Sequence, residues 1–132
     1  MLEEKLLKAY RNIAIVGAST NPARPSHQVA RYLAEHGYHI IPVNPNEREI
    51  DGQKSYPNLS SIPEPVEMVD IFRRPEEVMP IVDEAINIGA KAVWMQLGIV
   101  NEEAAARARD AGLIVVMDKC MHNEHQQMMR HF

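Results

Sequence analysis

The sequence has little of several features that mark particular classes of protein. It contains a single cysteine, Cys120, which excludes an internal disulfide framework and a zinc site built from clustered cysteines. Its 14 Lys and Arg residues are outnumbered by 18 Asp and Glu residues, so no overall positive charge attracts a nucleic-acid backbone or an anionic membrane. We therefore expect no nucleic-acid partner and no membrane partner, and local groups must hold any anionic ligand.

Long apolar runs are also lacking. No segment approaches the roughly 20 apolar residues of a membrane-spanning helix, and the first five residues, MLEEK, do not resemble a signal peptide. We therefore expect a cytoplasmic protein. The 132 residues, 45% of them hydrophobic, suit one domain with one continuous core, so residues 1–132 are predicted to form a single domain.

A pattern that occurs three times dominates the rest of the chain: an amphipathic segment, then a glycine, then a β-rich apolar segment. The glycines are Gly37, Gly89 and Gly112, each placed to end a helix in a left-handed conformation before a strand. Residues 44–65, with four prolines, are predicted to be a loop with at most a short helical turn near 58–62. The predicted helices are 26–36, 75–88 and 101–111, and the predicted strands are 13–16, 38–43, 66–72, 90–95 and 113–117.

Several of these strands are too continuously apolar to have one face in water, which indicates a parallel sheet covered by helices on both faces. The expected fold is α/β: a Rossmann-like, doubly wound, five-stranded parallel sheet in three layers. Because crossovers between parallel strands are right-handed, the simplest strand order is 3-2-1-4-5. Ligands of such sheets bind at the carboxyl ends of the strands, where the order reverses, so the candidate site lies there.

The segment after the first strand has the composition of an anion-binding turn. It reads GASTNPARPS from Gly17 to Ser26, and Ser26 is the predicted N-cap of the following helix. Amides at a helix start attract anions, Ser19 and Thr20 add hydroxyl donors, and Arg24 adds a positive charge. Any strand-to-helix turn also needs a glycine and small polar residues, so composition alone leaves a purely structural role equally open.

The turn differs from the two common nucleotide-binding motifs. Ser19 and Pro22 stand where the GxGxxG dinucleotide motif has its second and third glycines, and the GxxxxGK[ST] motif is lacking. NAD-binding proteins usually carry an acid at the end of the second strand, whereas this chain has PVNP there. The neutral Asn44 of that segment accepts a phosphorylated ribose such as that of coenzyme A. NADP carries a phosphate at the same position and is an alternative ligand.

Five short motifs stand at the ends of the predicted strands: GAS (17–19), PVNP (42–45), DIFRRP (70–75), WMQLGI (94–99) and DKC (118–120). Together they resemble the stand-alone CoA-binding proteins, which are similar to the N-terminal domain of the succinyl-CoA synthetase alpha subunit. The resemblance covers about residues 10–126 and implies a Rossmann-like domain that binds coenzyme A through its ADP part, with the segment 94–98 beside the pantetheine. The implied contact residues are Gly17, Ala18, Ser19, Thr20, Arg24, Pro42, Asn44, Pro45, Phe72, Arg73, Pro75, Gln96 and Gly98.

The chemistry of three of these positions suits such a ligand. Phe72 offers an apolar face to adenine, and Arg73 offers a cation to a phosphate. Without the resemblance, the simpler explanations are that Phe72 is a core residue and that Arg73 is a solvated charge. Gln96 directly follows an apolar strand and can hydrogen-bond an amide of the ligand.

Cysteine and histidine allow further hypotheses. Cys120 is a candidate for thiol exchange with coenzyme A, favoured by the neighbouring Lys119; the alternative is a small buried hydrophobic residue. His122 and His125, with Glu124 between them, fit the polar end of a terminal helix better than a metal site, so no metal is expected.

The sequence thus favours a protein that binds coenzyme A or acyl-CoA without catalysis of its own, since it offers no set of nucleophile, base and orienting group. The synthetase that the chain resembles uses a histidine of a second domain and a nucleotide on a partner subunit; this chain has room for neither, so ligase activity is not expected. The alternatives are an NADP-type oxidoreductase, a CoA-dependent enzyme completed by a partner, and a scaffold with a vestigial cleft. A monomer or small homo-oligomer is expected.

Overall fold

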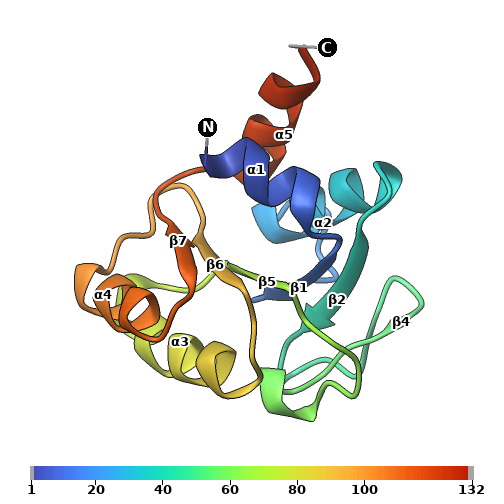
Figure 1. The fold of residues 1–132 in the computed structure, drawn as a ribbon. Coiled ribbons are helices and arrows are strands. Elements are labelled where there is room, and N and C mark those ends of the chain that lie inside the picture. Colours follow the sequence, from blue (N-terminus) through green and yellow to red (C-terminus); the bar gives the residue numbers. More distant parts are fainter. Residues whose placement is uncertain (1, 131–132) are drawn as a thin grey trace.

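The computed structural model describes residues 2–130, which form a central parallel sheet between two layers of helices (Figure 1). The predicted α/β class, with its doubly wound, Rossmann-like, five-stranded parallel sheet, is confirmed. The sheet strands are β1 (Asn12–Val16), β2 (His39–Val43), β5 (Met68–Ile71), β6 (Ala92–Met95) and β7 (Ile114–Val116). The helices are α1 (Leu2–Ala9), α2 (Pro25–Glu35), α3 (Val78–Asn87), α4 (Glu102–Asp110) and α5 (Met121–Arg130).

The position of the third sheet strand, β5, corrects the predicted order. The sheet runs β2-β1-β5-β6-β7, so β5 pairs with β1 and not with β2. Numbered as in the prediction, the order is 2-1-3-4-5 instead of 3-2-1-4-5, and it reverses between β1 and β5.

Pro42 in β2 explains this arrangement. Its carbonyl points away from β1 and accepts a hydrogen bond from the Tyr56 amide (3.0 Å), and its nitrogen, on the same side, has no hydrogen to donate. A strand interrupted in this way suits the edge of a sheet. β2 is therefore an edge strand, while β5, buried at all four positions, lies in the interior of the sheet.

The connection from β2 to β5 and the N-terminal segment contain more structure than predicted. The connection includes a small antiparallel hairpin of β3 (Glu49–Ile50) and β4 (Gln53–Lys54). The 3-10 turn η1 (Leu59–Ser61) lies where a helical turn was expected, and a second one, η2 (Pro75–Glu77), precedes α3. α1, outside the predicted helices, packs Leu6 and Leu7 into the core.

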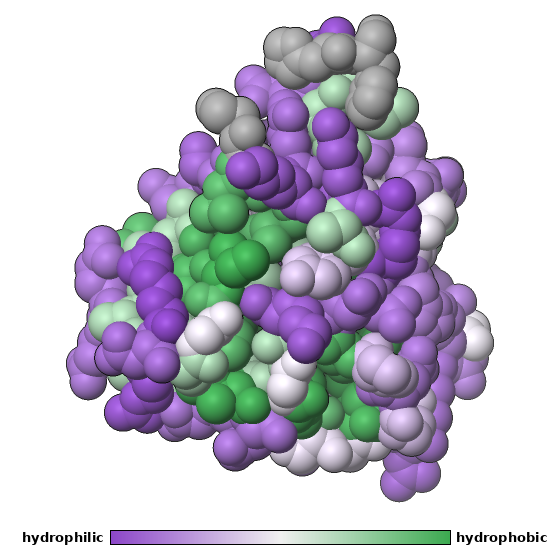
Figure 2. All heavy atoms as spheres, viewed as in Figure 1, coloured by the Kyte–Doolittle hydropathy of each residue, from purple (hydrophilic) through white to green (hydrophobic). Residues whose placement is uncertain are grey.

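The two faces of the sheet have separate cores. Ala14 and Val16 of β1 face α3 and α4, whereas Ile13 and Ile15 face α1, α2 and α5, as the alternation of strand side chains requires. Figure 2 shows apolar side chains gathered beside the edge strand β7, where Ile114 is exposed.

Among residues 2–130, no helix combines the length and apolar character needed to cross a membrane.

Candidate functional site

A cleft of about 870 Å³ opens at the carboxyl ends of β1, β5 and β6. The turn after β1 and the first turns of α2 form one wall, and the start of α5 forms another. The sheet order reverses between β1 and β5, so the cleft occupies the position at which doubly wound sheets bind ligands.

The cleft brings together most, but not all, of the residues selected from the sequence. Thr20, Pro45, Pro75 and Gly98 do not line it, and Pro42 lines a separate hollow between α2 and the β3–β4 hairpin. The selected residues that line the cleft are Gly17, Ala18, Ser19, Arg24, Asn44, Phe72, Arg73, Gln96 and Cys120.

Two of the residues outside the cleft connect the loops that border it. The Gly98 amide donates to Asp118 Oδ1 (2.7 Å) and so links the loops after β6 and β7. The Pro75 carbonyl accepts from Asn101 Nδ2 (2.9 Å), which links η2 to the start of α4. These residues therefore support the rim of the cleft.

Gly17 makes the turn after β1 possible. Its φ is +92°, and a Cβ there would lie 2.5 Å from the carbonyl oxygen of Phe72, so only glycine allows this approach of the two chain segments. The Gly17 amide donates to the Val43 carbonyl (3.0 Å), and Asn44 Nδ2 donates to the Ala18 carbonyl (2.8 Å). Asn44 thus positions the turn from the β2 side.

Arg24 and the start of α2 supply the positive end of the cleft. The helix begins at Pro25 with Arg24 as its N-cap, so the predicted N-cap, Ser26, lies inside the first turn. The Arg24 side chain makes no capping bond, and within residues 2–130 its guanidinium has no ion pair. The amides of the first turn and the helix dipole therefore act with a free cation on any anion in the cleft.

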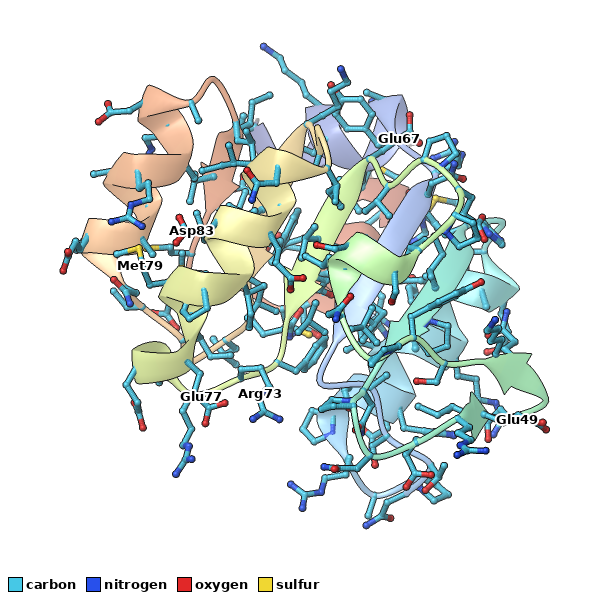
Figure 3. All side chains as sticks on the ribbon, turned by 90° about the horizontal axis from the view of Figure 1, so that it is seen from below. Glu49, Glu67, Arg73, Glu77, Met79 and Asp83 are labelled. Atoms are coloured by element: carbon cyan, nitrogen blue, oxygen red, sulfur yellow. The ribbon has the colours of Figure 1, made fainter. Side chains whose placement is uncertain are left out.

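Arg73, by contrast, is paired. Glu77 accepts hydrogen bonds from Nε (2.7 Å) and Nη2 of Arg73 and from Nε (3.0 Å) and Nη2 (2.8 Å) of Arg74. The hydrogen bonds from Arg74 and Arg73 lower the pKa of Glu77, which keeps it ionised. Figure 3 shows Arg73 and Glu77 side by side, with Glu67 at the opposite end of the sheet. Arg73 Nη1 has no partner within the described residues and can still bind a phosphate.

Gln96 connects the floor of the cleft to α5. It is 4% exposed, and its Oε1 accepts from the Met121 amide (3.0 Å). Its Nε2 has no partner among residues 2–130, which leaves two donors for a ligand. Trp94 is fully buried and its Nε1 donates to the Lys119 carbonyl (2.9 Å), so Trp94 holds the segment before α5 and does not line the cleft.

The sequence reasoning missed the contribution of α5. His122 and Asn123 line the cleft together with Cys120, and Leu97 and Ile99 add apolar surface. The available signal was that α5 directly follows the DKC motif at the carboxyl end of the fifth sheet strand.

In the part of the chain that the structure describes, no three His, Cys, Asp or Glu residues come together as a metal site.

Asp70 lies beneath this cleft and also escaped the sequence reasoning. It is fully buried, and neither carboxylate oxygen has a hydrogen-bond partner within the described residues. Burial raises the pKa of Asp70 well above its ordinary value. Because side chains two apart on a strand share a face, Asp70 lies one layer below Phe72.

Comparisons with known proteins show the family to which the chain belongs. Residues 11–126 match the family described as CoA binding domain, and the chain belongs to that family. It is 38% identical over 122 residues to an uncharacterized protein, YneT, of Bacillus subtilis, which covers 92% of this chain and 90% of that one. A solved structure of a hypothetical protein from Pyrococcus horikoshii superposes with a TM-score of 0.94 at 44% identity, covering 96% of this chain and 89% of that one.

A more distant relative is an enzyme subunit. The alpha subunit of ADP-forming acetate–CoA ligase II from Pyrococcus furiosus is 33% identical over 84 residues, covering 63% of this chain. The match covers 18% of that subunit, so the chain corresponds to less than a fifth of the ligase subunit. The resemblance to CoA-binding proteins and to synthetase-like subunits is thereby confirmed.

Proposed function

We propose that this protein binds coenzyme A or an acyl-CoA, with the ADP part in the cleft and the diphosphate at the start of α2. One observation carries the proposal. In a member of the CoA binding domain family, the cleft at the reversal of the sheet combines an unpaired Arg24 with a helix start that has no side-chain cap.

The remaining contacts suit the other parts of this ligand. Phe72 offers an apolar surface to adenine, and Arg73 Nη1 is a free donor for the ribose phosphate. Gln96 Nε2 can donate to an amide carbonyl of the pantetheine. A volume of about 870 Å³ lies within the range of pockets that enclose small organic ligands.

We further propose that the protein acts as a binding module without catalysis of its own. Arg24, Gln96 and the turn amides are groups that hold a ligand, and none of them is a nucleophile. One relative is a subunit of an acetate–CoA ligase, but the match to this chain covers only 18% of that subunit.

Isothermal titration with coenzyme A, dephospho-CoA and NADP tests the proposal. Coenzyme A is expected to bind most tightly, and dephospho-CoA about tenfold more weakly, because one charge-assisted contact to the ribose phosphate is lost. Tighter binding of NADP would favour the oxidoreductase alternative. If none of the three bound, the cleft would be vestigial and the proposal would be wrong.

The thiol end of the ligand is proposed to lie near Cys120, which is half-buried and lines the cleft. With CoA disulfide, the Cys120 thiolate would attack one sulfur, form a protein–CoA mixed disulfide and release one CoA thiolate. Mass spectrometry should then detect the added CoA on Cys120 and none on Cys120→Ser. An unmodified wild-type protein would contradict this part of the proposal.

A further inference from the structure

A cluster of aromatic and imidazole rings joins α2 to α5. The ring of Tyr32 is stacked between two imidazoles, with centroid distances of 3.7 Å to His122 and 4.1 Å to His36. The Tyr32 hydroxyl lies 2.7 Å from His125 Nδ1, and His36 Nδ1 lies 2.7 Å from the Tyr32 carbonyl. One tyrosine therefore holds three histidines in place.

The cluster is unfavourable for positive charge. Burial, and then the proximity of His36, lower the pKa of both His122 and His125. Arg11 adds a fixed positive charge: it also lowers the pKa of His125 and lies 4.8 Å from the ring of Tyr38. The groups that face the cluster are Tyr32 and His36 from α2, His122 and His125 from α5, Tyr38 before β2, and Arg11 before β1.

His122 differs from the other two histidines because it also lines the cleft. Arg24, Arg73 and Arg74 line the same cleft, so in the absence of ligand His122 shares it with three guanidinium groups. Glu77 is paired with Arg73 and Arg74 and offsets part of their charge, whereas Arg24 is unpaired. An anionic ligand there reverses the sign of the local charge, and an opposite charge nearby favours the protonated imidazole. Binding of the ligand and protonation of His122 are then thermodynamically linked.

We propose that His122 is a proton-linked contact of the cleft, neutral without ligand and protonated when an anionic nucleotide binds, with Tyr32 as its positioning residue. This inference rests on the proposed function and extends it. Because the bound state takes up a proton, the affinity of the cleft for the nucleotide rises as the pH falls through the range in which His122 titrates.

Histidine titrations followed by NMR test the inference. Dephospho-CoA is the suitable probe because it lacks the ribose phosphate, whose own second ionisation lies near pH 6. Saturation with dephospho-CoA should raise the pKa of His122 by about half a unit or more, which corresponds to an electrostatic contact across the cleft. His122→Gln assigns the resonance. His39, an exposed residue at the far end of β2 paired with Glu64 (2.5 Å), is the control and should not shift.

Calorimetry gives a second, independent readout. At pH 6, binding enthalpies measured in two buffers of different ionisation enthalpy should show net proton uptake by the wild type and by His39→Gln. His122→Gln should still bind the probe but with little uptake. Tyr32→Leu removes the ring between the imidazoles, so it should raise the pKa of His122 in the free protein and reduce the ligand-induced shift.

Three outcomes would overturn the inference: an unchanged His122 midpoint on saturation, a shift matched by His39, or equal proton uptake by His122→Gln and wild type. In each of these the probe still binds, so the proposed function survives. A protein that produces neither heat nor resonance shifts with dephospho-CoA or coenzyme A would overturn both.

Discussion

The two faces of the sheet are packed by different kinds of side chain. Among residues 2–130, the buried members of the core between the sheet and α3 and α4 are aliphatic residues and methionine, with Tyr56 partly buried against them. The face covered by α1, α2 and α5 also buries Asp70, Tyr38 and His125. Both α2 and α5, which begin at the cleft, belong to this second face. The first face thus serves stability, whereas the second face combines stability with the proposed ligand binding.

The largest expected effect is at Gly17, at the junction of β1, β5 and the cleft. Gly17→Ala places a Cβ 2.5 Å from the Phe72 carbonyl oxygen at a φ of +92°. We expect it to lower the free energy of unfolding by about 3 kcal/mol or more and to abolish coenzyme A binding. Gly37→Ala is a matched control, because its φ is +90° and no atom lies within 4 Å of the new Cβ. It should cost about 1 kcal/mol; equal losses in urea unfolding would contradict the steric explanation.

A pair of valines tests the difference between the faces directly. Val82 of α3 and Val29 of α2 are both buried, but only Val29 lines the cleft. Each Val→Ala change should lower the free energy of unfolding by about 2 kcal/mol, because apolar contacts are lost and a cavity is left. Calorimetry should show weaker coenzyme A binding for Val29→Ala alone. Equal effects on binding would mean that the two faces do not differ in function.

Substitutions of two arginines test whether coenzyme A binding depends on a local positive charge or on the net charge of the protein. Arg24→Gln should weaken coenzyme A binding about tenfold, or about 1.4 kcal/mol, because the unpaired cation at the start of α2 is lost. Arg109 is exposed in the last turn of α4, on the other face, and Arg109→Gln changes the net charge equally. Its dissociation constant should stay within about twofold of wild type. Comparable losses for the two variants would rule out a specific contact at Arg24.

The smallest expected effect concerns Asp70. Since burial raises its pKa, the folded protein keeps a proton that the unfolded chain releases above about pH 4. The folded state therefore binds more protons, and the contribution of Asp70 to stability falls as the pH rises. Asp70→Asn removes this term, so its stability relative to wild type should increase between pH 5 and pH 8. Parallel pH profiles in denaturant unfolding would contradict a raised pKa of Asp70 in the folded protein.

Local patterns in the sequence were sufficient for the fold class and for the location of the cleft. The glycines at 37, 89 and 112 separate helix from strand, and the continuous apolar strands require helices on both faces. The turn from Gly17 to Arg24 follows the first strand, which places it at the carboxyl edge of any parallel sheet. These inferences hold because each depends on a few consecutive residues.

The sequence alone could not provide what depends on residues far apart in the chain. The prediction placed the third strand beside the second, because nothing local shows which edge of the first strand it will pair with; in the structure Pro42 keeps β2 at the sheet edge. Gln96 was selected as a ligand contact, but only the structure shows that its side-chain oxygen accepts a hydrogen bond from the Met121 amide.

By itself, the sequence determined an α/β fold with a glycine-containing turn after its first strand, since helix caps, strand patterns and turns are encoded within short segments. Only the tertiary structure decided the strand order and the stacking of Tyr32 on His122. The strand order follows from how whole elements pack. The stacking joins residues 90 positions apart, and no local preference specifies contacts of that kind.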